Sequence, residues 1–553
     1  MLRPVVASSK GEAYLICTQA VGSKYLTQPA IAYRNDPTSC YAIGTNGMGF
    51  GSDPDGDTFW LSTLYPDLEQ KEVIDLPTWL GETCLAEGGQ WIQYGYAAQK
   101  SVLPAVVTAA AHLSAVPIDV ADVAVVFGLS SDPKEDLSQT WAELKSDADV
   151  YSNLASLYLK NSSHLVKQNP GYKFDVDYRP AQHHLTSEMD IGIVDFVVKS
   201  KAFSFFLPEG CVPFTEEHRL HSRIVREFSS TKSTPTAVYG YDDTVPLFGG
   251  DTYEAETNCA REHNLGQIAS VSVNNLGFYS RNPVSVDNPL KVNPAPEVVY
   301  DLEKKYVAFV IGDGDNLYFL KKRNRGWVDE RMDKCESRSC FPLTWTMSPR
   351  GAMDMPDIIR YYYDKALETG SDYFMLPPSG SLYSYPSQMG AEGRKLYAKM
   401  VEEDLAMMSS ITTVHWEWFY SWRTAFSFYF PLFNDLTTEP RGFVLTNVPY
   451  MFPIFLYRRN ELFKVIGENV VVFKPNEWRG TGGGRNQESL EDKANELNGL
   501  KGGDVVQIYA TSDGGLDLDH IYDLVENYLD EDVVVVDSDT ATRFALEAAK
   551  LKK

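Results

Sequence analysis

Carboxylates beside aromatic side chains are the residues of this chain whose types and spacing could do chemistry. Asp313 and Asp315 are separated by one glycine and follow directly after an apolar run. Glu417 lies between two tryptophans, and Glu477 precedes a third. This combination fits sugar hydrolysis, in which one acid protonates the leaving oxygen and a second acts as nucleophile or base. The aromatic rings would pack against the apolar faces of pyranose rings.

The expected roles of these acids follow from their neighbours. We expect Asp315 and Glu417 to form the acid pair, with Asp313 orienting or tuning its neighbour, and Glu477 is the second choice of partner. Two close carboxylates push one pKa upward, which keeps a general acid protonated near neutral pH. The sequence leaves open whether the enzyme would retain or invert, because that depends on a carboxyl separation of about 5 Å or about 6.5–9.5 Å.

Further polar and aromatic residues at predicted strand ends are expected to bind the sugar. They are Asn316, Asp243, Trp345, Ser379, Tyr383, Tyr385, Trp416 and Glu477. Asp313 and Asp315 could instead share a cation, since oxygen ligands suit Ca²⁺ or Mg²⁺, but a full ligand set is not visible. The segment 312–317 also lacks the third glycine of a dinucleotide-binding motif and has acids where a pyrophosphate would lie. We therefore predict no metal and no other cofactor.

From about Thr234 onward, strand-like and helix-like segments alternate, and these elements must position the candidate residues. Nine short apolar runs, of which Tyr306 to Ile311 is the clearest, each end in polar or glycine-rich residues. Segments long enough for helices separate them, such as 357–367 and 394–408. Strand and helix in alternation predict a parallel sheet with right-handed crossovers. About eight such units would close a (β/α)8 barrel, and a doubly wound open sheet is the alternative.

Three domains are predicted along the chain. Residues 1–115 read as an N-terminal α/β domain, with a helix through 101–116, and residues 116–230 as a second α/β segment that packs on the barrel. Residues 231–553 would be the barrel domain that carries the site. In a barrel and in an open parallel sheet alike, the carboxyl ends of the strands face one side. The candidate residues should therefore gather there.

Composition excludes several classes of partner. The 553 residues are 44% hydrophobic and 23% charged, which is ordinary for a folded protein of more than one domain. A formal net charge of −25 opposes binding to nucleic acid or to an anionic membrane surface. No apolar run reaches the roughly 20 residues of a membrane span, so we expect no membrane insertion. A carbohydrate is the partner that the candidate site predicts, and no oligomeric state is inferred.

The cysteines bear on the cellular compartment in which the protein is found. None of the seven cysteines forms a zinc-type CxxC pair. Cys335 and Cys340 could close a small disulfide or remain free thiols, and Asn161-Ser162-Ser163 is a glycosylation acceptor sequence. No signal peptide is visible at the start of this sequence. A disulfide here, together with the acceptor sequence, would favour an extracellular or secretory location, and the alternative is a free thiol pair with a chance acceptor sequence.

A family resemblance is carried by Gly380-Ser381-Leu382-Tyr383-Ser384-Tyr385-Pro386. With the segment FVIGDGDN before it and PLTWTMSP between, this motif resembles the GxGYxYP family, which is described as putative glycoside hydrolases. The resemblance is strongest over residues 300–390 and implies a barrel more than it implies a reaction. Leu382 replaces the second glycine of the motif, so its side chain could narrow a pocket or disfavour a turn with positive φ.

A protein of another class would use the same residues without turnover. A catalytically silent barrel could bind glycans, or build an extracellular assembly, through the same aromatic side chains. An enclosed pocket with paired carboxylates would favour the enzyme, and a filled or flat rim would favour the binding or assembly protein.

Overall fold

The computed structural model describes most of residues 90–167, 194–240 and 264–551, with short segments among the first 66 residues. Within these ranges the undescribed positions are 121–122, 125–131, 211, 231–234, 269, 271–272, 274–275, 281–282, 286, 295, 322, 419–420, 447–455, 480–487 and 511–515. The chain divides into two compact units. They are Met1–Cys259 with Gln267–Asn282, and Ala260–Gly266 with Pro283–Lys553. The three predicted domains stay a prediction, because compactness does not show which segments fold independently.

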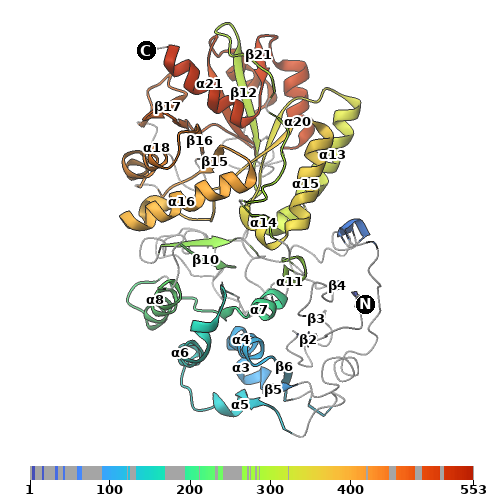
Figure 1. The fold of residues 1–553 in the computed structure, drawn as a ribbon, viewed down its shortest axis with the longest axis vertical. Coiled ribbons are helices and arrows are strands. Elements are labelled where there is room, and N and C mark those ends of the chain that lie inside the picture. Colours follow the sequence, from blue (N-terminus) through green and yellow to red (C-terminus); the bar gives the residue numbers. More distant parts are fainter. Residues whose placement is uncertain are drawn as a thin grey trace. The chain divides into compact units, whose positions relative to one another are not determined.

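The first unit contains mostly parallel β-sheet and helices (Figure 1). A three-stranded parallel sheet has the order β6 (Val116–Asp119), β5 (Trp91–Tyr94), β7 (Glu135–Asp136). A four-stranded sheet has the order β11 (Leu265–Ile268), β10 (Thr236–Tyr239), β8 (Leu165–Lys167), β9 (Phe203–Phe205), and the first two residues of β11 are counted with the second unit. The two antiparallel pairs near the N-terminus are β1 (Arg3–Val5) with β4 (Tyr41–Ile43) and β2 (Leu15–Cys17) with β3 (Ala32–Arg34).

The longer helices of this unit are α4 (Leu103–Leu113), α6 (Asp147–Tyr158), α7 (Val194–Ser200) and α8 (Glu216–Ser229). The shorter ones are α3 (Tyr96–Gln99), α5 (Leu137–Thr140) and α11 (Leu276–Tyr279). The helix predicted over 101–116 is confirmed as α4, in which small and β-branched residues are buried along almost the whole length. It ends at Ser114, whose left-handed conformation (φ 52°) lets its N–H bond back to the last turn.

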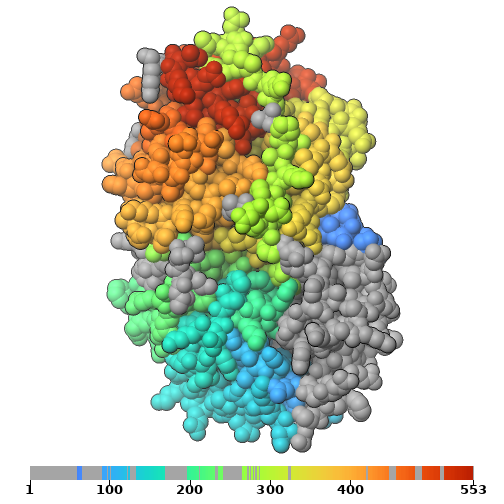
Figure 2. Space-filling view, viewed as in Figure 1, coloured from blue at the N-terminus to red at the C-terminus, as the bar shows by residue number. Residues whose placement is uncertain are grey.

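The second unit contains two sheets. The six-stranded sheet is wholly parallel and has the order β14 (Asp372–Met375), β13 (Leu343–Thr346), β12 (Lys305–Ile311), β20 (Val505–Ala510), β19 (Glu477–Trp478), with β21 (Val533–Val535) paired to the first part of β12. The four-stranded sheet has the order β15 (Thr412–His415), β16 (Arg441–Leu445), β18 (Val470–Phe473), β17 (Phe463–Ile466), with β17 antiparallel. Figure 2 shows residues near 300 and the C-terminal residues side by side in lime and red, where β21 adjoins β12.

Helices follow most of these strands, as the predicted alternation requires. They are α12 (Leu317–Lys321), α13 (Arg323–Ser337), α14 (Pro349–Asp354), α15 (Pro356–Thr369), α16 (Ala391–Met408), α17 (Trp422–Thr424), α18 (Leu432–Leu436), α19 (Leu490–Asn498), α20 (Leu518–Asp523) and α21 (Ser538–Leu551). The helices predicted over 357–367 and 394–408 are confirmed as α15 and α16. Gly370 (φ 68°) ends α15 in the left-handed conformation that glycine adopts without strain.

The mixed α/β fold with parallel sheets is confirmed, but the predicted (β/α)8 barrel is not. The described strands of the second unit form two sheets that are joined by the single bridge between Leu376 and Thr413, and they do not close into a ring. The predicted strand that starts at Thr236 is β10, and it pairs with β8 in a separate sheet.

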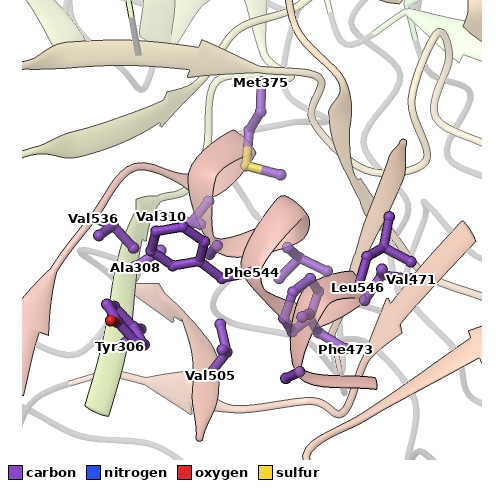
Figure 3. Close-up of a cluster of buried hydrophobic side chains, with 14 of the residues drawn as sticks. Tyr306, Ala308, Val310, Met375, Val471, Phe473, Val505, Val536, Phe544 and Leu546 are labelled. Atoms are coloured by element: carbon purple, nitrogen blue, oxygen red, sulfur yellow. The ribbon is translucent and has the colours of Figure 1, made fainter. Parts of the chain in front are cut away.

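Helix α21 gives a physical reason for the open arrangement. Phe544 and Leu546 of this helix pack in one cluster with Val310 and Val505 of the first sheet and with Phe473 of the second (Figure 3). The interior of a closed barrel is filled by side chains of its strands. Here the C-terminal helix supplies part of that filling, so the two sheets bury their apolar faces without pairing all round.

Asp539, in the first turn of α21, predicts a pH dependence of stability. Its carboxylate accepts hydrogen bonds from Thr412 Oγ1 (2.6 Å) and Ile411 N (3.2 Å). Burial and the charge of Asp537 nevertheless raise the pKa of Asp539 from 3.8 to about 6. The folded state therefore holds this proton more tightly than the unfolded chain does. Its contribution to stability is greatest below about pH 4 and is lost as the pH rises through about 6.

We expect Asp539→Asn, which stays neutral, to remove this dependence. Between pH 4 and pH 6.5 the unfolding free energy of the wild type should fall relative to the variant, by up to about 3 kcal/mol. Urea unfolding across this pH range measures the difference. Glu547→Gln, an exposed acid on the same helix, is the matched control. Parallel pH curves for the wild type and Asp539→Asn would contradict the prediction.

Candidate functional site

The turn after β12 is built around two glycines. A Cβ at Gly314 would lie 1.7 Å from the carbonyl oxygen of Thr346, and a Cβ at Gly312 would lie 2.6 Å from the hydroxyl oxygen of Tyr509. The Thr346 hydroxyl donates to the carbonyl of Ile311 and accepts from the N–H of Gly314, each at 2.9 Å. The backbone of β13 therefore leaves no room for a side chain at Gly314, and the side chain of Tyr509 fills the space beside Gly312.

The two aspartates of the turn are only partly buried. Asp313 adopts the left-handed conformation with φ 67°, which aspartate tolerates better than most residues. Asn316 is buried, and its Oδ1 accepts a hydrogen bond from the N–H of Tyr318 (2.9 Å). It thereby caps the start of α12. The substrate-binding role predicted for Asn316 stays a prediction.

Tyr509 was missed by sequence reasoning, and it links the turn to another acid. It lies on β20, opposite Val310 of β12 on one side and Glu477 of β19 on the other. The N–H of Asp313 donates to its hydroxyl oxygen (3.4 Å). Burial and the charges of Asp313, Asp315 and Glu477 raise the pKa of Tyr509 well above its usual value. The turn after β12 and Glu477 therefore both adjoin Tyr509.

Glu477 is the first residue of the two-residue strand β19, pairs with Tyr509 one residue before the end of β20, and is 6% exposed. Its Oε2 is 3.8 Å from Nε of Arg479. Because β19 is the parallel neighbour of β20, Glu477 lies on the same edge of the sheet as the turn after β12. The sequence contained this signal as a Glu-Trp pair after an apolar run, but it did not give the strand order.

Glu417, the predicted partner acid, is buried in a different setting. Its Oε1 accepts from the N–H of Ser387 (3.0 Å) and lies 3.1 Å from Nε2 of His415, and its Oε2 accepts from the hydroxyl of Ser421 (2.8 Å). Glu417 is 1% exposed. These contacts tie the end of β15 to the segments that precede α16 and α17. The catalytic role predicted for Glu417 stays a prediction.

His415 lies inside an aromatic cluster. It is fully buried, its ring is stacked on Tyr429 at a centroid distance of 5.2 Å, and Phe430 and Phe443 approach it edge-on. Tyr429 belongs to a π-helical turn, Ala425–Tyr429. Nε2 of His415 meets Glu417, and the rest of the ring faces core residues.

The signature motif folds into a loop that is mostly buried. The hydroxyl of Ser379 lies 2.7 Å from the carbonyl oxygen of Ser384, and Nε1 of Trp416 donates to the same oxygen (3.0 Å). The ring of Tyr383 is half-buried and meets Trp416 edge-on at 4.2 Å, and the ring of Tyr385 lies 5.7 Å from Trp416. The structure therefore brings these four predicted residues together. Tyr383 is the most exposed of them, and their roles in binding stay predictions.

Leu382 is accommodated by a glycine elsewhere in the chain. A Cβ at Gly266 would lie 2.4 Å from Cβ of Leu382. The N–H of Leu382 donates to the hydroxyl of Tyr397 (3.0 Å), which donates to the carbonyl of Leu382 (2.6 Å). Leu382 is absent from the residues with positive φ, whereas Gly380 has φ 93°. The leucine at the motif's second glycine therefore fills space inside this unit and needs no left-handed turn.

Trp345 and Asp243 are not placed with the other candidates. Trp345 is 3% exposed, and its Nε1 donates to Oδ1 of Asp372 (2.7 Å), which also pairs with Arg331. Alternation along β13 directs Thr346, and not Trp345, to the face that holds the turn after β12. Asp243 lies outside the described residues.

The described residues bear on metal binding and on membrane insertion. Among the residues that the structure describes, no group of three or more His, Cys, Asp or Glu side chains is arranged to hold a metal ion. Within the same described part of the chain, no helix is both long enough and apolar enough to cross a membrane.

Comparison with known sequences identifies one part of the chain. Residues 303–421 match the family described as "GxGYxYP putative glycoside hydrolase C-terminal domain". The matched range holds the turn after β12, the signature loop and Glu417, and it confirms the resemblance seen in the motifs. No curated protein matches the sequence.

Comparison with solved structures supports the fold. A crystal structure described as "a putative hydrolase from Bacteroides thetaiotaomicron VPI-5482" aligns with a TM-score of 0.63 and 16% identity, covering 89% of this chain and 87% of that one. At this identity the likeness shows the fold alone.

Two further structures align weakly. One is a "putative polysaccharide deacetylase from Mycobacterium smegmatis", with TM-score 0.30, 12% identity, and coverage of 47% of this chain and 96% of that one. The other is a 4-alpha-glucanotransferase from Thermococcus litoralis, with TM-score 0.27, 12% identity, and coverage of 43% and 40%. Scores this low say nothing about the fold.

Proposed function

We propose that this chain, whose residues 303–421 match the C-terminal domain of the GxGYxYP family, hydrolyses a glycan with carboxylates in the turn after β12 and on β19. One observation carries the proposal. The turn after β12 and the strand β19 both adjoin Tyr509: the N–H of Asp313 donates to its hydroxyl oxygen (3.4 Å), and Glu477 is its register partner. Glycoside hydrolysis requires two carboxyl groups on either side of the scissile bond.

The proposed roles divide between the two strands. Asp315 and Glu477 act as the acid pair, and Asp313, adjacent to Asp315 in the same turn, tunes its neighbour. Both aspartates are partly accessible to a substrate. Glu417 is the less favoured partner, because hydrogen-bond donors of the protein already surround its buried carboxylate. Half-buried Tyr383, which packs edge-on against Trp416, is the aromatic residue most able to meet a sugar ring.

A glycan array followed by hydrolysis assays on the bound glycans tests this proposal. We expect at least one bound glycan to release new reducing ends at a rate proportional to enzyme concentration. Glycans that bind and remain intact would support the second candidate, a silent glycan-binding or assembly protein. The buried signature loop favours that candidate, because Ser379, Tyr385 and Trp416 are occupied with one another and expose little surface. Absence of any glycan binding would contradict both candidates.

We also propose an extracellular or secretory location. Cys335, near the end of α13, forms a disulfide with Cys340, and such bonds persist in oxidising compartments. Asn161 of the glycosylation acceptor sequence is exposed. When the protein is unfolded without reduction and its free thiols are titrated, neither Cys335 nor Cys340 should react. Peptide mapping identifies the cysteines that do react. Two reactive thiols at these positions would contradict this proposal.

A further inference from the structure

Strand β19, which carries Glu477, has little backbone pairing to hold it in place. It is two residues long and is the last strand on its side of the sheet among the described strands, with β20 as its neighbour. The N–H of Tyr509 donates to the carbonyl oxygen of Asn476, just before the strand (2.8 Å). So short a ladder does not by itself hold a side chain as rigidly as catalysis requires. The position of Glu477 therefore depends on the side chains that anchor this strand.

Lys493 of α19 is a buried cation beside the strand. It is 1% exposed, and its ammonium donates to Oδ1 of Asn476 (3.0 Å). Two carboxylates neutralise it, because Oε2 of Glu496 lies 2.7 Å from Nζ and Oε2 of Glu488 lies 2.5 Å from Nζ. The side-chain amide of Asn476 also donates to Oε1 of Glu496 (2.7 Å). Both members of a buried ion pair therefore hold the Asn476 side chain.

These contacts lie on the side of the strand away from Glu477. Trp478 is fully buried, and its Nε1 donates to the carbonyl oxygen of Glu488, which leads into α19 (3.2 Å). Side chains alternate along a strand, so Asn476 and Trp478 point to one side and Glu477, between them, points to the other. Helix α19 thus anchors the strand from behind, while the opposite side presents the Glu477 carboxylate.

We propose that Lys493 is a positioning residue for Glu477: through Asn476, it fixes the two-residue strand that carries this acid. The inference rests on the proposed function, because it names the group that sets the place of one proposed acid. An ammonium between two carboxylates makes charge-assisted hydrogen bonds, which are stronger than neutral ones. Without the ammonium, Glu488 and Glu496 repel each other and the grip of α19 on the strand is lost.

Lys493→Met is the first test, and its readout is the separate change of kcat and KM. Methionine keeps much of the apolar stem and removes the charge. We expect kcat to fall about tenfold to a hundredfold, because a displacement of about 1 Å at a catalytic group can have an effect of this size. KM should change less than about twofold, since a buried lysine behind the strand binds no ground-state substrate.

Asn476→Ala tests whether Lys493 acts through the strand. It removes the side chain that the ammonium holds and keeps the ion pairs of Lys493 with Glu488 and Glu496. We expect a loss of kcat similar to that of Lys493→Met, and no further loss when the two changes are combined, because both break the same connection. Losses of kcat that multiply in the double variant would overturn the proposal.

Arg441→Met is the matched control for lost stability. Arg441 is 8% exposed, begins β16 in the other sheet of this unit, and bonds the carboxylate of Glu402 through two contacts of 2.7 Å. Each variant removes one buried cation from an ion pair, so both should lose stability. Only Lys493→Met should lower kcat in the folded protein. Equal losses of kcat in the two variants would show a merely structural role and overturn the proposal.

Hydrogen exchange separates this inference from the proposed function, because it needs no substrate. The N–H of Tyr509 is bonded to Asn476, so its exchange rate reports whether β19 stays docked on β20. Lys493→Met should speed this exchange about tenfold or more, and Arg441→Met should leave it unchanged. If Lys493→Met does not fold, Asn476→Ala, at a half-buried position, is measured in its place. Unchanged exchange overturns the role of Lys493, whereas faster exchange in a protein that cleaves no glycan overturns only the proposed hydrolysis.

Discussion

Replacing Asp315 with asparagine is expected to lower glycan turnover about a thousandfold or more while the protein stays folded. Loss of a general acid or base typically has an effect of about 10²–10⁴. Asparagine has nearly the shape of aspartate but cannot transfer the proton. Asp315 is partly exposed in a turn fixed by Gly312 and Gly314, so the backbone should not change. Initial rates on a glycan that the wild type cleaves, with circular dichroism as the check on folding, measure this effect.

Two glutamine variants identify the partner acid. Glu477→Gln should cause a loss of the same order as Asp315→Asn. Glu417→Gln should chiefly lower stability, because the amide would place a donor among the groups that donate to Glu417. If Glu417→Gln stays folded but loses turnover while Glu477→Gln remains active, Glu417 is the partner acid, as the sequence predicted. Full activity of Asp315→Asn would exclude Asp315 as the acid.

Breaking the buried ion pair between Arg331 and Asp372 is expected to have the largest effect on stability. Nε of Arg331 lies 3.2 and 3.3 Å from the two carboxylate oxygens, and the residues are 1% and 4% exposed. Arg331 also donates to the hydroxyl of Tyr522 and the carbonyl of Phe341. This guanidinium therefore joins α13 to β14, to α20 and to the segment before β13.

Arg331→Met should lower the free energy of unfolding by about 3–5 kcal/mol, because it leaves the Asp372 charge buried without its counter-charge. Urea unfolding followed by tryptophan fluorescence measures this loss. Arg331→Met combined with Asp372→Asn should recover part of it, since no charge is then left unpaired.

Lys399→Met is the surface control for this pair. Lys399 and Glu403 lie 3.6 Å apart with side chains that are 67% and 51% exposed. Removing this pair should cost less than about 1 kcal/mol. Equal losses for Lys399→Met and Arg331→Met would contradict the importance of the buried pair.

Local sequence pattern determined much of the second unit. The apolar run that ends in Gly-Asp-Gly-Asp is the central strand β12, and the alternation of apolar runs with amphipathic segments predicted helices such as α15 and α16. Side-chain periodicity and strand ends are properties of neighbouring residues, so a single sequence displays them. The same local reading found the acids after β12 and the signature loop that residues 303–421 share with the family.

The order of the strands in the sheet could not be predicted from the local sequence pattern. Tyr509 follows Asp313 by almost 200 residues, yet the two meet because β20 pairs with β12 along its whole length. Trp345 and Glu417 were predicted to belong to the site because they lie at the ends of apolar runs. The structure instead gives them buried partners, Asp372 for the first and Ser387, His415 and Ser421 for the second.

The sequence by itself thus determined the strand β12, the helices α4, α15 and α16, and the position of Asp313 and Asp315 directly after β12. Only the tertiary structure decided that α21 fills the space between two sheets, so that no barrel closes among the described strands. It also decided that Tyr509 of β20 lies between the turn after β12, whose Asp313 N–H donates to its hydroxyl, and Glu477 of β19, its register partner. The physical reason is that pairing between strands distant in sequence depends on how all the apolar faces are buried together, which no local segment encodes.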